Sequence, residues 1–163
     1  DTKEAGAFQK EYGSIFIEYN IGPLSLGLDY VPGVISTPEN TNIQGTVRNT
    51  VAGEFENHST LYAIIPIPLG GLYLKAGAIY VDINTLENLG TGGTYGNVDT
   101  TGFTAGLGWN HEAAEGFHIR AEILAAEYDS VSASNTAGMP GSTQVTLEDM
   151  MSASGRISLV KTF

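Results

Sequence analysis

A strict two-residue alternation in the segment 100–123, "TTGFTAGLGWNHEAAEGFHIRAEI", is the feature that most constrains the fold of this chain. In its first half, aromatic and aliphatic residues alternate with small or polar ones, and in its second half apolar residues alternate with His118, Arg120 and Glu122. Successive side chains of a β-strand point to opposite faces, so the segment predicts two strands, each with an apolar and a polar face. A soluble sandwich would bury the aromatic face, whereas a closed barrel in a bilayer would turn it towards lipid and keep the glycines and charges inside.

The same alternation recurs along the chain and predicts seven strands, separated by clusters of Gly, Pro, Asn and Asp. These strands are expected at 13–20, 24–30, 54–67, 72–84, 100–110, 117–131 and 143–163. Phe16 departs from the alternation of the first strand, and the phase of the third is ambiguous because "STLYAIIPI" is apolar on both faces.

Short and long connections alternate between the predicted strands. Residues 20–23, 68–71 and 111–116 are expected to be short turns, whereas the stretches at 33–50, 85–99 and 132–142 are long and rich in polar residues and glycine. A soluble sandwich does not require such alternation, but outer-membrane barrels have short periplasmic turns and longer outer loops. The long connections therefore predict a polar, solvent-facing surface at one end of the molecule.

Composition excludes several classes of protein. A chain of 163 residues fits one domain, 1–163. The net charge of −11 argues against a nucleic-acid surface, which needs clustered Lys and Arg. There is no cysteine for a disulfide or a thiolate metal site. No apolar run reaches the length of about 18 residues that a transmembrane helix needs, so a barrel is the one way for this chain to span a membrane.

The charged residues within the predicted strands share the face that carries the glycines. They comprise three anions and three cations, namely Glu18, Asp29, Glu122, Lys75, Arg120 and Arg156. The interior of an eight-stranded barrel is just wide enough to be filled by side chains, so charges inside it must be paired. We therefore expect an ionic barrel interior in which Arg120 contacts at least one of Glu18, Asp29 and Glu122. The alternative is that these residues are ordinary charges on the wet face of a soluble sheet.

The opposite face is apolar, with aromatic residues near the strand ends: Tyr19, Tyr30, Tyr80, Trp109, Phe117 and Phe163. In a membrane barrel they would form an aromatic girdle at the headgroups. Trp109 and Phe117, on either side of the turn at 111–116, are then expected outside the barrel at one membrane interface. Aromatic residues at strand ends also occur in sandwich cores, so this pattern supports the barrel without deciding for it.

Three segments carry a resemblance to a known family. "GFTAGLGWNHEAAEGFHIRAEILAAEYDSV" and "LGGLYLKAGAIY" resemble hairpins of small bacterial outer-membrane β-barrels of the OmpA/OmpX type. The end of the chain, "ISLVKTF", resembles the signal that the outer-membrane assembly machinery reads, with Ile157, Leu159 and Phe163 in the matching positions; Lys161 departs from the pattern, which usually has an apolar residue there. The resemblance implies an antiparallel up-and-down transmembrane β-barrel of eight strands in the bacterial outer membrane.

Only seven strands are visible, whereas bacterial single-chain barrels have an even number. We therefore expect one further strand, which either precedes residue 1 or comes from another chain and pairs with both 13–20 and 152–163.

The chain offers little for catalysis. A relay of His58 and Ser59 with Glu54 or Glu56 is conceivable, but adjacent strand residues point to opposite faces and cannot join one relay without a bulge. His111 is expected in a solvated turn and His118 as a hydrogen-bonded interior residue. The D-x-D-x-D-G pattern of a calcium loop is missing. No catalytic, cofactor or metal site is therefore expected.

The leading hypothesis for function is a non-enzymatic outer-membrane barrel with a lumen filled by side chains. Its expected partners are outer-membrane lipid, the assembly machinery and other envelope or surface proteins at the outer loops, with no nucleic acid. Two alternatives stay open. A narrow outer-membrane pore needs spare volume in the interior, and a soluble ligand-binding barrel of the lipocalin type needs its apolar face inside.

Overall fold

The computed structural model describes residues 5–90, 92–136 and 144–163, which form an all-β, antiparallel fold. Its seven main strands are β1 (Ile15–Ile21), β2 (Leu24–Tyr30), β5 (Val47–Pro66), β6 (Leu72–Leu89), β7 (Val98–Ala114), β8 (Phe117–Tyr128) and β11 (Met150–Lys161). Four shorter strands are β3 (Ile35–Ser36), β4 (Asn40–Gln44), β9 (Val131–Ser134) and β10 (Gln144–Leu147). Within the described ranges no helix is long and apolar enough to cross a membrane.

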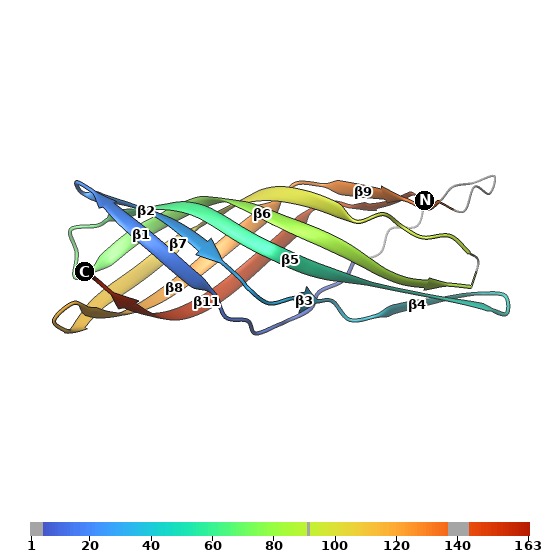
Figure 1. The fold of residues 1–163 in the computed structure, drawn as a ribbon, viewed down its shortest axis with the longest axis horizontal. Helices are drawn as coiled ribbons and strands as arrows, with labels where there is room; N and C mark the ends of the chain where they lie inside the picture. Colours follow the sequence, from blue (N-terminus) through green and yellow to red (C-terminus); the bar gives the residue numbers. More distant parts are fainter. Residues whose placement is uncertain (1–4, 91, 137–143) are drawn as a thin grey trace.

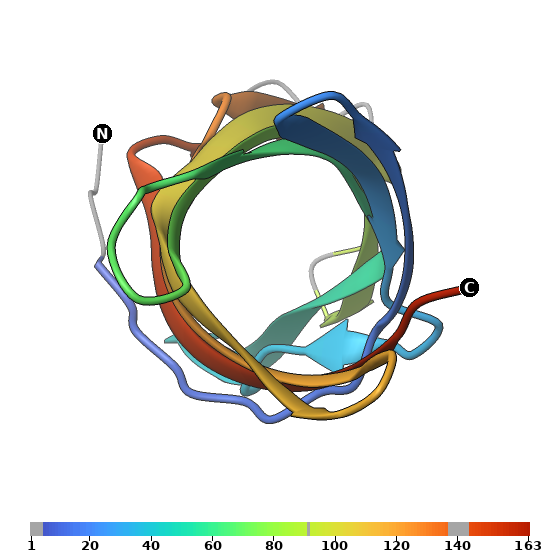
Figure 2. The same ribbon diagram turned by 90° about the vertical axis from the view of Figure 1, so that its left-hand side faces the viewer.

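The main strands form one meandering sheet in the order β1-β2-β5-β6-β7-β8-β11, and every neighbouring pair is antiparallel. The strands are tilted against the long axis of the molecule (Figure 1), and in the end view the sheet curls around a central space (Figure 2). β1 and β11 are the two ends of this sheet and do not pair with each other. The sheet is therefore curled and open along one line, which we call the seam.

Strand alternation assigns each side chain to the concave inner face or the convex outer face. On β6, Lys75 and Val81 are buried on the inner face, whereas Leu74 and Tyr80 are exposed on the outer face. The register with β6 also resolves the ambiguous phase of the third predicted strand. There, Thr60, Tyr62 and Ile64 point inward, while Leu61 and Ile65 point outward.

Two of the long loops predicted from the sequence contain strand segments. The stretch 33–50 contains β3, β4 and the start of β5, and the stretch 85–99 contains the end of β6 and the start of β7. β4, β5 and β6 pair well beyond the apolar part of the sheet, with partners such as Thr41 and Thr50. Backbone pairing does not need apolar side chains when both faces are wet, so the fading of the apolar pattern is a poor guide to where a strand ends.

Other predicted boundaries also move. The last predicted strand, 143–163, is divided into β10 and β11 by residues 148–149, where Asp149 has a φ of 54°. The turn at 111–116 is shorter than expected because β7 continues to Ala114 and Gly116 turns the chain at a φ of 69°. The predicted loop at 132–142 begins within β9, and its residues 137–142 lie outside the described residues.

Candidate functional site: a charged inner face and an apolar outer face

The structure places all six of the charged residues singled out in the sequence on the inner face and joins them by ion pairs. Arg120 on β8 lies 2.5 Å from Glu18 on β1. Of the three carboxylates that strand alternation put on its face, Glu18 is therefore the one with which Arg120 pairs. Lys75 on β6 lies 3.2 Å from Glu122 on β8.

Arg156 on β11 connects the remaining carboxylate, Asp29, to Glu122. Its Nη1 lies 2.5 Å from Asp29 on β2, and its Nε lies 3.7 Å from Glu122. Residues from five strands, which lie up to 138 positions apart between Glu18 and Arg156, therefore meet on one face.

The buried charges are paired and also hydrogen-bonded. Lys75 and Glu122 are each only 4% exposed, and a charge buried to this degree is costly unless its partners compensate for lost water. The Tyr73 hydroxyl donates to Glu122 at 2.7 Å, and the Tyr62 hydroxyl donates to Glu18 at 2.7 Å. The ammonium of Lys75 also lies 3.9 Å from the centre of the Tyr62 ring, at a distance where a cation–π interaction contributes.

Several residues of this inner face were missed by the sequence reasoning. Tyr73 could have been found, because it is two positions from Lys75 and therefore shares its face. Tyr62 could not, since the phase of its strand was ambiguous. Phe16, the exception in the first strand, points inward, where the guanidinium carbons of Arg156 and Arg120 lie 5.0 Å and 5.9 Å from its ring centre.

Glycines make room for the two inner tyrosines. Gly27 is the cross-strand partner of Tyr62, and Gly108 is the cross-strand partner of Tyr73. A β-carbon added at either glycine would overlap the ring of its partner. At these two positions of the polar face, glycine therefore lets an aromatic ring lie against the neighbouring backbone.

The outer face carries an apolar belt around all seven main strands. Its large apolar side chains that are at least 40% exposed include Ile15, Ile17, Tyr19, Leu26, Leu28, Leu61, Ile65, Leu74, Tyr80, Phe103, Leu107, Trp109, Ile119, Ile123, Ile157 and Leu159. Ile123 and Phe103 are 75% exposed although they lie in the middle of the sheet. Exposed apolar patches larger than a few hundred Å² are rare on soluble monomers, so a belt of this extent needs another apolar partner.

The belt has the height of a membrane barrel's apolar band. On β6 it runs from Leu72 to Tyr80, nine residues. At about 3.4 Å per residue and a tilt of about 40°, this corresponds to roughly 20–25 Å, close to the 25 Å or so that is usual for such bands.

Aromatic residues lie at the limits of the belt, as the sequence predicted for its outer face. Trp109 donates from Nε1 to the Gly70 carbonyl at 2.9 Å, and Tyr80 donates to Asp82 at 2.7 Å. The ring of Phe117 lies 4.2 Å from the ammonium of Lys161. Each ring thus combines an apolar body with a polar contact, as interfacial aromatic residues do.

The remaining predicted aromatics and the residues predicted to form an assembly signal also face outward. Tyr19 and Phe163 are exposed, and Tyr30 donates its hydroxyl to Asn57. Ile157 and Leu159 alternate outward on β11 and are more than 80% exposed.

The histidines do not assemble the relay considered from the sequence. A register shift between Glu56 and Ser59 turns His58 inward, where its Nε2 lies 3.2 Å from the Tyr128 hydroxyl. The Ser59 hydroxyl instead donates to the carbonyl of Asn57. His118 lies 3.2 Å from the Asn110 amide on the inner face, as an interior hydrogen-bonded residue.

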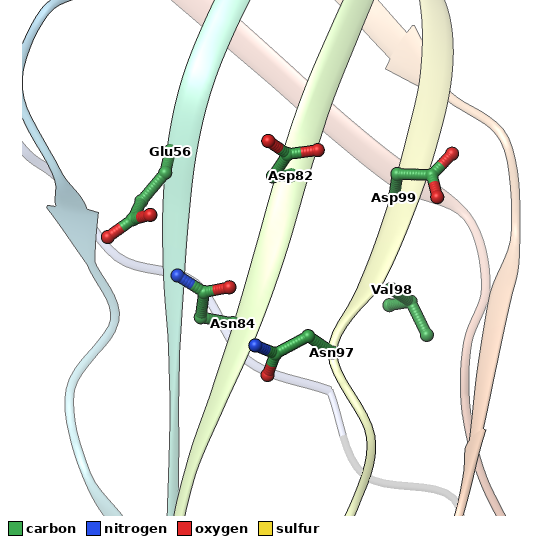
Figure 3. A pocket seen from close by; sticks show the side chains of 6 residues that line it. All are labelled: Glu56, Asp82, Asn84, Asn97, Val98 and Asp99. Atoms are coloured by element: carbon green, nitrogen blue, oxygen red, sulfur yellow. The ribbon is translucent and has the colours of Figure 1, made fainter.

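An acidic hollow of about 200 Å³ lies on the outer surface beyond the belt (Figure 3). Glu56, Asp82 and Asp99 are cross-strand neighbours there on β5, β6 and β7. Hydrogen bonds from Asn57 and Tyr80 lower the pKa of Asp82, which keeps this carboxylate charged. Within the described residues, no group of three or more His, Cys, Asp or Glu side chains is arranged to hold a metal ion.

Comparison with known proteins leaves the geometry as the basis for any functional argument. No protein-family model, no curated protein and no solved structure matches this chain.

Proposed function

We propose that this chain is a non-enzymatic β-barrel protein of the bacterial outer membrane, with a lumen filled by ion-paired side chains. One observation supports the proposal above all: the polarity of the two faces of the sheet is the reverse of that in a soluble protein. Its six ion-paired residues are buried or half-buried on the concave face, and most of its large apolar residues are exposed around the convex face. Lipid is the environment in which this inversion is favourable, because it covers the apolar belt without requiring a protein partner on every strand.

The proposed barrel has eight strands, of which the structure holds seven. The strand tilt in Figure 1 and the curl in Figure 2 support this architecture. The short connections at 22–23, 67–71 and 115–116 would face the periplasm, and the long β4–β5–β6 extension would project from the outer surface. In this arrangement the terminal residues Ile157, Leu159 and Phe163 are available to the assembly machinery, and the outer segments can contact other envelope or surface proteins.

The filled inner face opposes the transport alternative. Two arginines, a lysine, two tyrosines and Phe16 meet across the narrow interior. The same face opposes a lipocalin-like function, which needs an apolar interior with room for a ligand. We therefore place the function of the protein at its lipid-facing belt and its outer segments.

Fractionation tests the proposal. Expressed with an export signal in a Gram-negative host, the protein should sediment with outer membranes and resist extraction by carbonate. On a detergent gel, the unboiled sample should migrate faster than the boiled one, because a membrane barrel stays folded in detergent at room temperature. Recovery in the soluble fraction without detergent would contradict the proposal.

A further inference from the structure

The seam is the part of the molecule that the proposed function leaves incomplete. β1 pairs only with β2, and β11 pairs only with β8, so each main strand at the seam has one unpaired edge in the described structure. Unpaired backbone groups in lipid cost several kcal/mol each, so a membrane protein cannot leave these edges open.

Strand direction determines what can close the seam. Six antiparallel steps separate β1 from β11, so the two strands run in the same direction. A single strand that runs the opposite way is antiparallel to both, and it raises the number of main strands from seven to an even number. A second copy cannot supply it while keeping the same membrane orientation, because both of its own free edges, β1 and β11, run in the wrong direction.

The side chains at the seam define the chemistry of that strand. The inward charges on either side already have partners, with Arg120 on Glu18 and Arg156 on Asp29. The Phe16 ring lies near both guanidinium groups, 5.9 Å from that of Arg120 and 5.0 Å from that of Arg156. A further inward charge would have no partner, and a large inward side chain would compete with the Phe16 ring.

The outward side chains at the seam are apolar on both edges. Ile15, Ile17 and Tyr19 line the β1 edge, and Ile157 and Leu159 line the β11 edge. A strand between them continues the apolar belt only if its own outward residues are apolar.

The described N-terminal segment, 5–14, adds no strand to the seam, although Tyr12 near its end interacts electrostatically with Arg156 on β11 and Asp29 on β2. Phe8 stacks on Phe55, 6.4 Å between ring centres, and Phe55 belongs to the part of β5 that pairs beyond the apolar belt. Residues 5–14 form no strand and approach β1 from that same end (Figure 1).

We propose that the seam is the docking site for one extended strand, antiparallel to β1 and β11, in which small uncharged inward residues alternate with apolar outward residues. This inference rests on the proposed membrane function and adds to it the width of the opening and the side-chain chemistry of its occupant. About 9 to 11 residues are needed to span the belt.

Cysteine pairs measure the width of the seam in a chain that has no cysteine of its own. Arg156 faces Phe16 across the seam, so Ile17 and Ile157 project outward at the same level. Ile17→Cys with Ile157→Cys tests the seam, and Ile17→Cys with Leu28→Cys is the matched control, since Ile17 and Leu28 are direct cross-strand partners on the same face. Both variants are refolded into lipid vesicles and oxidised.

The control pair should form a disulfide and the seam pair should not, because a strand position between β1 and β11 separates them by about 10 Å, beyond disulfide reach. A bifunctional thiol reagent of about that span should bridge the seam pair. Formation of the seam disulfide as readily as the control, or a disulfide between two copies, would overturn the inference.

Synthetic peptides test the chemistry of the occupant. A peptide in which serine alternates with leucine should raise the temperature at which the compact gel band converts to the unfolded one. A peptide with aspartate in place of each serine should not. Equal effects of the two peptides, or no effect of either, would overturn the inference. Failure of the vesicle-bound protein to resist protease would instead contradict the membrane function itself, which separates the two outcomes.

Discussion

At the scale of single residues, Glu122 is the centre of the inner face. It accepts hydrogen bonds from Lys75 and Tyr73, and it also lies within ion-pair distance of Arg156. Lys75 has no other carboxylate within ion-pair distance among the described residues. Loss of the Glu122 charge would therefore leave a buried ammonium without a counter-charge.

Glu122→Gln should lower the free energy of unfolding by about 3 to 5 kcal/mol, because breaking one side of a buried ion pair leaves the other uncompensated. Urea unfolding in lipid vesicles measures the loss. Glu39→Gln is the control, since Glu39 is exposed and lies 4.0 Å from the exposed Arg48, so its loss should be below about 1 kcal/mol. Adding Lys75→Met to Glu122→Gln should recover part of the stability; a further loss would show that the pair is not the cause.

Gly108→Ala should lower the free energy of unfolding by about 1 to 3 kcal/mol, because the new methyl group overlaps the Tyr73 ring and displaces its hydroxyl from Glu122. The same unfolding assay applies. Gly155→Ala on β11 is the matched control, because its β-carbon meets no atom within 4 Å. A loss of equal size in both variants would point to backbone effects and not to the Tyr73 contact.

At the scale of elements, the hairpin of β7 and β8 places aromatic residues at the end of the apolar belt. Trp109 is the one tryptophan of the chain and lies on the outer face, 41% exposed. Its indole nitrogen donates a hydrogen bond to the Gly70 carbonyl in the β5–β6 turn, which holds the ring at the end of the apolar belt.

Trp109 fluorescence should be quenched most by lipids that carry a bromine near the headgroup and less by lipids brominated near the chain ends. The reason is that an indole with an apolar body and a satisfied N–H is most stable at the interface. Intrinsic fluorescence in brominated vesicles reports its depth, with unbrominated vesicles as the reference. Quenching by an aqueous quencher alone would place Trp109 outside the membrane.

At the scale of the whole molecule, the inner face decides between a closed lumen and a pore. The ion pairs connect β1, β2, β6, β8 and β11, strands that surround the central space in Figure 2. Side chains that pair across the interior also fill it, as expected for a barrel of eight strands.

Vesicles that contain the protein should therefore not swell in isotonic solutions of small sugars, because side chains fill the interior of the proposed barrel. Light scattering after dilution into the sugar solution measures swelling. Vesicles with a general porin are the positive control, and protein-free vesicles the negative one. Swelling at the rate of the porin would support the pore alternative.

The sequence by itself determined the seven main strands, though not their ends, and the face on which most of their residues lie. The period of a strand is two and depends only on the local backbone, so Lys75, Arg120 and Glu122 could be placed together on one face without knowledge of the fold. The same reasoning failed where the local sequence pattern does not distinguish the two faces of a strand or mark where the strand ends. The phase of β5 depends on its pairing with β6, and polar strand ends such as β4 are visible only through their partners.

Only the tertiary structure decided which face is concave and which charges meet. Alternation is identical whether the apolar face is inside or outside, because the curl of a sheet is a property of many strands together. The pairing of Arg120 with Glu18, 102 positions away, depends on how that curl brings β8 towards β1. Strand alternation alone puts Phe16 on the face of Glu18, but the guanidinium groups that lie near its ring come from β8 and β11 across the seam, which only the tertiary structure shows.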